Sequence, residues 1–187
     1  KTKNVHATQI GAVNCVLVGA NTKGINTDWI GYLGSIKNTK IKKSGKILIL
    51  GFGGAAQAIF YGFSKKKYKN IIVFNRSRKA IKTSGAIRFT KKYSLIDKHL
   101  KEADLIINTT PTNPLNRKQT KLIKTSTIIS DIVYKPKETA FLKNFKENKK
   151  IYGISMLIEQ AIPCFHYWFG FSPDVDSELL NKINSKI

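Results

Sequence analysis

The chain has 187 residues and a formal net charge of +22, and 42% of its residues are hydrophobic. This length and apolar content can fill a core, which excludes an intrinsically disordered chain, and no apolar run is long enough to cross a bilayer. The basic residues are mostly lysines spread along the whole chain, without an arginine-rich cluster among aromatics, so we interpret the charge as a solvated surface and not as a nucleic-acid interface.

Strands and helices alternate along the predicted fold. In chain order we expect a strand at 12–18, a helix at 29–36, an exposed polar stretch at 37–43, a strand at 46–51, a helix at 54–66, a strand at 71–74, a helix at 95–102, strands at 103–108 and 127–133, a helix at 139–148, a short strand at 151–152, and closing helices at 156–169 and 177–187. Residues 77–93 follow no clear period and look abbreviated. The alternation predicts an α/β fold with a Rossmann-like, doubly wound parallel sheet. The apolar run Val16–Val18 in the first strand predicts that both of its faces are covered.

A glycine-rich turn follows the strand at 46–51. Gly51-Phe52-Gly53-Gly54-Ala55-Ala56 leads from this strand into a helix with the spacing of a dinucleotide-binding motif. Gly51 permits the tight turn, Gly53 lets the backbone approach a pyrophosphate, and Ala56 allows close packing of the helix on the strand. The helix N-terminus then presents free N–H groups to the phosphates. An ordinary strand–helix turn is the alternative, but strand, glycines, helix and second strand follow in the order that a nucleotide site requires.

The end of the second strand of this sheet indicates the cofactor. NAD enzymes usually carry an acidic residue there, about 20 residues after the first glycine, to bind the ribose hydroxyls. This chain has Asn75-Arg76-Ser77-Arg78-Lys79 instead. Arg76 can contact a 2′-phosphate with two hydrogen bonds and stack on adenine. We therefore predict NADP, with a basic surface turn as the alternative.

Cysteine and histidine residues are few and scattered. They are Cys15, Cys164, His6, His99 and His166. Their spacing predicts neither a disulfide scaffold nor a metal site, and it favours a protein of the reducing cytoplasm. The start of the chain lacks both a signal peptide and an initiating methionine, so we expect it to begin inside a longer protein.

Six motifs in order resemble those of the shikimate dehydrogenase family. They are Ile10-Gly11-Ala12-Val13-Asn14, Gly24-Ile25-Asn26-Thr27-Asp28-Trp29-Ile30-Gly31, Asn75-Arg76-Ser77, Ile107-Asn108-Thr109-Thr110-Pro111, Asp131-Ile132-Val133-Tyr134-Lys135-Pro136, and Gly153-Ile154-Ser155-Met156-Leu157-Ile158-Glu159-Gln160. The resemblance runs from Ala7 to the closing helices. A set of six ordered motifs is much more specific than any one of them.

The resemblance implies roles for residues of this chain. Asp28 would be half of a catalytic Lys–Asp pair and would bind a substrate hydroxyl, and further substrate contacts would come from Asn14, Tyr134 and Gln160. Thr109 and Thr110 would lie beside the cofactor, and the nicotinamide would be flanked by Ile132, Gly153 and Met156. The implied reaction is hydride transfer between NADPH and the ketone of 3-dehydroshikimate, which gives shikimate, with a lysine supplying the proton.

Each proposed substrate residue also has a structural interpretation. Asp28 could be a helix cap, Asn14 could bond a neighbouring backbone group, Tyr134 could be a core residue, and Gln160 could lie on a helix surface. Their joint placement in the motifs favours the functional interpretation.

The chain departs from the family's pattern in several places. The Pro-x-Lys segment with the catalytic lysine and the Ser/Thr-rich carboxylate-binding motif are both absent, and we expect the lysine that pairs with Asp28 to lie upstream of Lys1. Cys15 replaces a threonine, and Asn113-Pro114 stands where a glycine is common. The family's later basic residue falls on Ala80, and Arg78 or Lys79 could substitute for it.

We expect residues 1–28 to be the remnant of an N-terminal α/β substrate domain, residues 29–153 to be the NADP-binding domain, and residues 154–187 to be helices that pack back toward the substrate domain. The expected partner is shikimate or 3-dehydroshikimate, bound by a monomer or homodimer. Two alternatives remain open at this point: a quinate/shikimate dehydrogenase with relaxed cofactor use, and a nucleotide-binding Rossmann module without catalysis.

Overall fold

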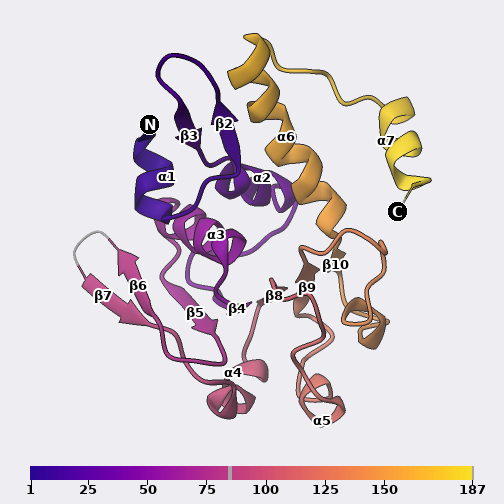
Figure 1. Cartoon of the computed structure of the whole chain (residues 1–187). Coiled ribbons are helices and arrows are strands. Elements are labelled where there is room, and N and C mark those ends of the chain that lie inside the picture. Colours follow the sequence, from indigo (N-terminus) through magenta and orange to yellow (C-terminus); the bar gives the residue numbers. More distant parts are fainter. Residues whose placement is uncertain (84–85, 187) are drawn as a thin grey trace.

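A computed structural model describes residues 1–83 and 86–186 and is built around a parallel five-stranded sheet (Figure 1). Its strands are β4 (Lys46–Leu50), β5 (Asn70–Phe74), β8 (Leu105–Asn108), β9 (Ile128–Asp131) and β10 (Lys150–Ile151), in the spatial order β10-β9-β8-β4-β5. Each adjacent pair is parallel. The predicted Rossmann-like sheet is confirmed. The strand order reverses between β4 and β8, and in open α/β sheets ligands bind beyond the carboxyl ends of the strands at such a point.

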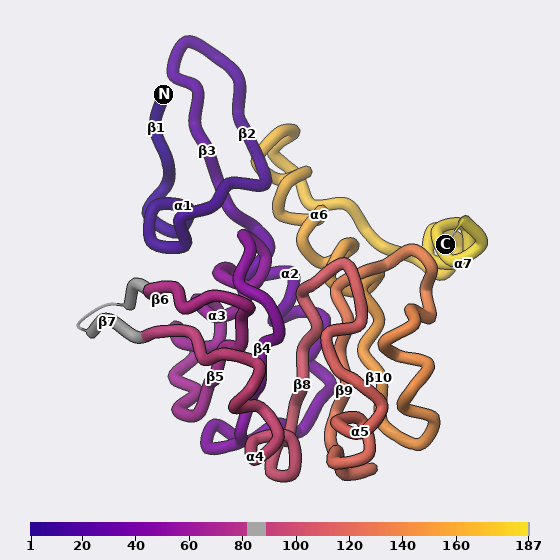
Figure 2. Tube along the Cα trace, turned by 60° about the horizontal axis from the view of Figure 1, so that its bottom comes forward, coloured from indigo at the N-terminus to yellow at the C-terminus, as the bar shows by residue number. Residues whose placement is uncertain are grey.

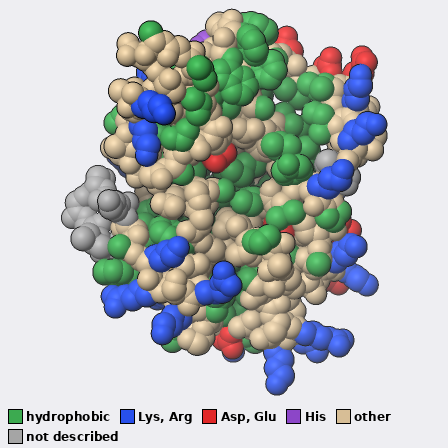
Figure 3. Space-filling view, in the orientation of Figure 1, with side chains coloured by type: hydrophobic (Ala, Val, Ile, Leu, Met, Phe, Trp, Pro, Cys, Tyr) green, Lys and Arg blue, Asp and Glu red, His purple; other side chains and the backbone are tan. Residues whose placement is uncertain are grey.

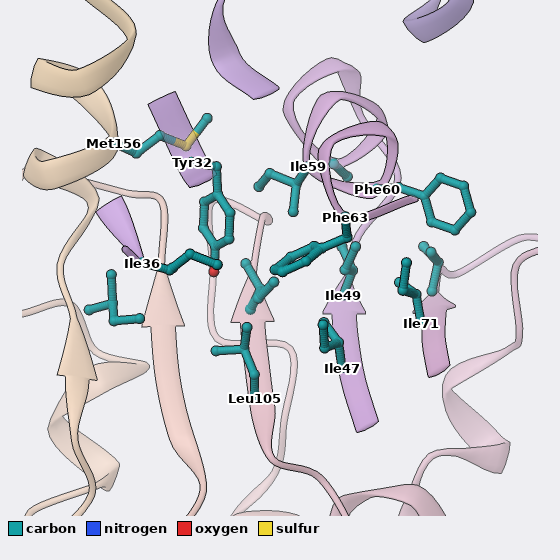
Figure 4. Close-up of a cluster of buried hydrophobic side chains, with 14 of the residues drawn as sticks. Tyr32, Ile36, Ile47, Ile49, Ile59, Phe60, Phe63, Ile71, Leu105 and Met156 are labelled. Carbon is teal, nitrogen blue, oxygen red and sulfur yellow. The ribbon is translucent and has the colours of Figure 1, made fainter. Parts of the chain in front are cut away.

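One face of the sheet is covered by α2 (Asp28–Ser35), α3 (Gly54–Lys65) and α6 (Gly153–Phe169). Figure 4 shows the cluster that forms there, in which the rings of Tyr32 and Phe63 lie against strand residues such as Ile49. The two rings pack edge to face with their centres 5.8 Å apart. Hydrophobic side chains of the central strands β4 and β8 are fully buried on both faces, as expected for a parallel sheet between two layers.

The opposite face is covered by short helices and turns. They are η1 (Tyr93–Leu95), α4 (Asp97–Leu100), α5 (Arg117–Thr120) and η2 (Leu142–Asn144). The helix predicted at 95–102 is therefore shorter than expected, and the one predicted at 139–148 is wrong except for the single turn η2. A polar side chain bonds to carbonyl groups that would accept backbone hydrogen bonds in a longer helix. The Asn144 amide donates to the carbonyls of Ala140 and Phe141.

The first segment forms a separate small sheet with one helix. Its elements are β1 (Thr2–Lys3), α1 (Val5–Ile10), β2 (Cys15–Leu17) and β3 (Lys23–Ile25), with the strand order β1-β3-β2. Figure 2 shows this sheet beyond one end of the parallel strands, and Ala12 lies beside Gly54 at the start of α3. The expectation that both faces of the first strand are covered is wrong, because β2 is an edge strand in which Val16 is 44% exposed and the following Val18 is 88% exposed.

Residues 77–93, which had no clear pattern, contain an antiparallel hairpin of β6 (Ala80–Thr83) and β7 (Ala86–Phe89). After the hairpin, Lys91 forms an isolated parallel bridge with Phe74 at the end of β5. Connections between parallel strands usually contain a helix. Here the connection from β5 to β8 contains this hairpin in addition to the short helices η1 and α4.

The closing helices are α6 and α7 (Ser177–Asn184), and the predicted end of the last helix at Ile187 lies outside the described residues. Hydrophobic side chains gather over the end of α6 in Figure 3, where Phe165, Trp168, Phe169 and Phe171 are all exposed. Lysine and arginine side chains are scattered over the rest of this face. Among the described residues, no helix combines the length and the apolar character needed to span a membrane.

Helices α2 and α6 approach each other closely at a glycine. A Cβ atom on Gly31 would lie 2.5 Å from the Gln160 Cβ and 2.7 Å from the Gln160 backbone nitrogen. These distances are too short for any side chain, and the second partner is backbone, which cannot rotate away. Gly31 therefore sets how near the two helices lie.

We expect Gly31→Ala to lower the free energy of unfolding by about 1–3 kcal/mol, since overpacking a tight contact forces the backbone apart. Gly19→Ala is the matched control because nothing lies within 4 Å of a Cβ built there. Urea denaturation of both variants measures the difference. Equal stability of the two variants would show that the α2–α6 contact is not tight.

Candidate active site

The turn after β4 requires glycine at its first position. Gly51 has a φ of +103°, and a Cβ there would lie 2.6 Å from the Thr109 Oγ1. Its N–H donates to the carbonyl of Phe74 at the end of β5 (2.8 Å). The chain can therefore turn sharply out of the sheet only with glycine at this point.

The start of α3 is open to a ligand. Gly53 caps the helix, is exposed, and has nothing within 4 Å of the place where a Cβ would be. Gly54 is also exposed, whereas Ala56 is fully buried against the core. Free N–H groups and small residues at a helix N-terminus suit a pyrophosphate, so this observation fits a dinucleotide.

The turn after β5 is fixed by hydrogen bonds of its backbone while its charged side chains are exposed. The Asn75 amide donates to the Ser77 carbonyl (3.1 Å). The Thr90 hydroxyl donates to the same carbonyl (3.1 Å) and accepts from the Lys79 N–H (2.9 Å). Arg76, Ser77 and Arg78 are exposed. The buried Thr90, which follows the hairpin, was missed in the sequence because it lies far along the chain from the motif it holds.

The turn after β8 uses its threonine hydroxyls within the protein. Thr109 donates to the Leu50 carbonyl (2.7 Å) and Thr110 to the Asn108 Oδ1 (2.7 Å). Both residues lie beside the glycine turn, since Gly51 faces both of them. Both hydroxyls thus use their donor proton within the protein and fix the turn beside Gly51.

A buried carboxylate links the ends of β8 and β9. Asp131 accepts hydrogen bonds from the Thr139 hydroxyl (2.6 Å), the Asn108 amide (3.2 Å) and the Val133 N–H (3.0 Å). Burial raises the pKa of Asp131, and these three donors counteract the increase. The sequence showed an amide and an acid at the ends of two strands, but Thr139 gave no signal.

Ile132, Gly153 and Met156 come together beyond β9. A Cβ on Gly153 would lie 2.4 Å from the Ile132 carbonyl oxygen, so only glycine allows the start of α6 to approach this strand. Met156 is 7% exposed and packs in the same core cluster as Ile132. The three residues predicted to flank a nicotinamide are neighbours at the carboxyl edge of the sheet.

A polar cluster joins the first segment to α6. The Asn14 amide lies within hydrogen-bond distance of the Asp28 Oδ1 (2.8 Å), the Thr27 Oγ1 (2.9 Å) and the Gln160 Oε1 (3.1 Å). The Asn14 Oδ1 accepts from the Thr27 N–H (2.8 Å). Three predicted substrate residues thus meet around one amide. The fourth, Tyr134, is 44% exposed, and within the described part of the chain no hydrogen bond of this cluster reaches it.

Two further residues belong to the cluster and were not predicted. Thr27 is fully buried, and its hydroxyl lies 3.2 Å from the Cys164 Sγ. Cys164 follows Gln160 by one turn of α6. Cys15 and Cys164 are both buried and unpaired, and burial, together with the neighbouring Cys164 thiol, raises the pKa of Cys15 to about 12. These two thiols are packing groups behind Asn14 and are not poised as nucleophiles.

Asp28 is the ionisable group of this cluster. It is the first residue of α2, after the N-cap Thr27, and its carboxylate accepts from the Asn14 side chain. Burial raises its pKa, and the Asn14 hydrogen bond opposes that increase. None of the ion pairs among residues 1–83 and 86–186 involves Asp28. A half-buried carboxylate without a cation can hold an arriving ammonium group or a hydroxyl.

Lys1 is the first residue of the chain and stands directly before β1. Its side chain is exposed, and β1 pairs with β3 through Thr2 and Lys23. In the part of the chain that the structure describes, Lys1 forms no ion pair with Asp28. Lys1 therefore does not take the place of the family's catalytic lysine, and the expectation that this lysine lies upstream of Lys1 stays a prediction.

A cavity of about 750 Å³ lies next to the glycine turn, between α1, α3 and β6. Phe52, Tyr61 and Lys65 are among the residues that line it, and none of the predicted site residues does. The candidate site is therefore the carboxyl edge of the sheet, and not this cavity.

Known proteins resemble this chain in sequence and in fold. The sequence profile of the Shikimate / quinate 5-dehydrogenase family matches residues 35–141. The shikimate dehydrogenase (NADP(+)) of Bartonella quintana is 36% identical over 97% of this chain and 68% of its own length. The Thermus thermophilus shikimate 5-dehydrogenase, solved with NADP(H) and shikimate, has a TM-score of 0.79 and 27% identity, covering the whole chain and 72% of that structure. The Corynebacterium glutamicum quinate dehydrogenase, solved with NAD, has a TM-score of 0.82 and 25% identity, covering 99% of this chain and 72% of that one.

The chain spans about two thirds of the length of the curated relatives that it matches, 68% for one and 64% for another. The similarity thus reaches almost every part of this chain but leaves about a third of each relative without a counterpart.

We expect Asp28→Asn to be more stable than the wild type at pH 7. Because burial raises the folded-state pKa of Asp28, the ionised form costs stability, and this cost grows as the pH rises from about 4 through the raised value. Asparagine keeps an acceptor for Asn14 and carries no charge. Thermal melts at pH 7 and pH 4 should show an advantage for the variant that shrinks at pH 4. A variant less stable than wild type at pH 7 would show that the charge itself supports the fold.

Proposed function

The chain belongs to the Shikimate / quinate 5-dehydrogenase family, and on that premise we propose that it is the nucleotide-binding part of an NADP-dependent enzyme that interconverts 3-dehydroshikimate and shikimate. The observation that carries this proposal is the cluster of Asn14, Asp28 and Gln160, which stands next to an open dinucleotide turn. A dinucleotide turn alone would support only nucleotide binding. The cluster adds a place for a polyhydroxylated substrate.

The residues along the carboxyl edge of the sheet fit NADP. Gly51, Gly53, Gly54, Ala55 and Ala56 would receive the pyrophosphate at the start of α3. Asn75, Arg76, Ser77 and Arg78 would hold the 2′-phosphate, since they form an exposed, braced turn that contains no acid. The walls near the nicotinamide would be Thr109, Thr110, Ile132, Gly153 and Met156. When bound, this cofactor supplies the hydride for the reaction.

Asn14 and Gln160 would orient the substrate by hydrogen bonds, and Tyr134 would contact it from the loop after β9. Asp28 would accept a hydrogen bond from a substrate hydroxyl and keep a neighbouring ammonium charged. The lysine that provides that ammonium has no counterpart in this chain. The absence of an ion-pair partner for Asp28 among the described residues supports the proposal that the cation comes from elsewhere.

We also propose the division of the chain at Asp28 and Gly153, into a substrate-domain remnant, a nucleotide domain and closing helices. The remnant is a separate small sheet, which supports the first boundary. A monomer or homodimer without a nucleic-acid partner, in a reducing cytoplasm, fits the unpaired cysteines and the scattered lysines.

Quinate is the second candidate substrate. The matching family includes quinate dehydrogenases, and one solved with NAD superimposes well on this chain. Shikimate is favoured because the basic turn after β5 suits NADP, and because the curated relatives at 36% identity are NADP-dependent shikimate dehydrogenases.

We expect Arg76→Glu to weaken NADPH binding by about 100-fold or more, because it replaces a charge-assisted contact to the 2′-phosphate with a like charge. NADH binding should change by less than about threefold. Calorimetric titration with each nucleotide measures both values. Equal losses for NADPH and NADH would remove Arg76 from the 2′-phosphate site.

We expect the chain of residues 1–187 to bind NADPH but to reduce 3-dehydroshikimate at least about 100-fold more slowly than a full-length relative, since the loss of a general acid alone commonly costs about 10²–10⁴-fold. Absorbance at 340 nm follows the reaction, with quinate and shikimate compared in the reverse direction. Turnover equal to that of a full-length relative would place the proton donor within this chain.

A further inference from the structure

A cation–π pair lies at the base of the β6–β7 hairpin. The Arg78 guanidinium lies 4.1 Å from the centre of the Phe89 ring. Phe89 ends β7 and is 49% exposed, and Arg78 is also exposed. A large aromatic side chain in such a position contributes little to the core. Its ring lies against the Arg78 guanidinium instead.

The hairpin also fixes the backbone on either side of this pair. The N–H of Thr90 donates to the Lys79 carbonyl (2.9 Å), and the Thr90 hydroxyl bridges the Lys79 N–H and the Ser77 carbonyl. The N–H of Asn75 donates to the Lys91 carbonyl (2.9 Å). Residues 75–79 and 89–91 are thus one braced unit. Within this unit, the Phe89 ring restricts where the long Arg78 side chain can lie.

The position of Arg78 matters for an anionic ligand. It follows Arg76 by two residues in the turn after β5, at the carboxyl edge of the sheet. An arginine that is already ordered loses less side-chain entropy when it binds a phosphate. Ala80, two residues after Arg78, has no charged group that could contact a phosphate. A guanidinium stacked on a ring keeps its outer N–H groups free to donate.

We propose that Phe89 is a positioning residue that holds Arg78 ready as the second phosphate-binding cation, so that the hairpin makes this chain select the 2′-phosphorylated dinucleotide. This inference rests on the proposed NADP-binding function and deepens it. Arg78 contacts the phosphate, and Phe89 acts only through Arg78. The hairpin thereby does more than connect β5 to Lys91.

A double-mutant cycle on the chain as it stands tests the coupling, with binding of NADPH and NADH measured for each variant. Arg78→Gln should weaken NADPH binding about tenfold, and Phe89→Leu about three- to fivefold, while NADH binding stays within about twofold. In the Arg78→Gln background, Phe89→Leu should have no further effect. Phe89→Trp should retain the wild-type affinity, because an aromatic plane remains.

Tyr68→Leu is a control for the loss of a cation–π pair away from this turn, although Tyr68 also packs on Phe63. It removes another cation–π pair, with Lys43 at 3.9 Å, which lies before β4 and β5 at the opposite edge of the sheet. It should leave the affinity for both nucleotides unchanged. A thermal melt of each variant separates loss of fold from loss of binding.

The outcomes distinguish this inference from the proposed function. If the wild type binds neither nucleotide, the proposed function fails. If the wild type prefers NADPH but Phe89→Leu binds both nucleotides as the wild type does, only the role of Phe89 is overturned. Additive losses in the double mutant, or equal losses for NADPH and NADH, would also overturn it.

Discussion

The contact between α2 and α6 at Gly31 determines where the polar side chains of the site can meet. Helix α2 begins at Asp28, and α6 carries Gln160 at the point of closest approach. Without a side chain at position 31, the Gln160 Oε1 comes within 3.1 Å of the Asn14 amide and 3.3 Å of the Thr27 hydroxyl. Other contacts also hold the first segment: the His6 Nδ1 lies 2.7 Å from the Tyr61 hydroxyl, and the Trp168 Nε1 donates to the Val16 carbonyl (3.1 Å). The close approach at Gly31 is thus one of the contacts that connect the first segment of the chain to its last long helix.

The charge differs between the two parts of the candidate site, the turns that would bind the nucleotide and the cluster that would bind the substrate. The nucleotide half offers an open helix N-terminus and the exposed cations Arg76 and Arg78, within a chain of net charge +22. The other half holds Asp28, whose pKa is raised by burial. This difference supports the proposal that the 2′-phosphate binds at the end of β5 and the hydroxylated ring near α2.

Local signals predicted the parallel sheet and the glycine turn, because a strand, a turn and a helix that follow one another leave a short-range pattern in the sequence. The motif positions of Asn14, Asp28 and Gln160 were likewise readable, and the structure brings them together. Contacts between residues far apart in the sequence could not be predicted. Thr90 bonds to a turn more than ten residues away, and Thr27 contacts Cys164 of α6. The β6–β7 hairpin could not be predicted because its sequence has no helical or alternating pattern. The exposure of β2 could not be predicted because it depends on which other strands lie beside it.

Hydrogen–deuterium exchange of this chain with and without NADPH tests the central claim, that the carboxyl edge of the sheet is the nucleotide site. The account predicts slower exchange of the amides in residues 51–57 and 75–79 on addition of NADPH, with no change in α5 or α7. Helix α5 lies on the opposite face, and α7 packs away from the glycine turn (Figure 1). Protection confined to α1 and the cavity beside α3, or no protection with saturating NADPH, would contradict the account.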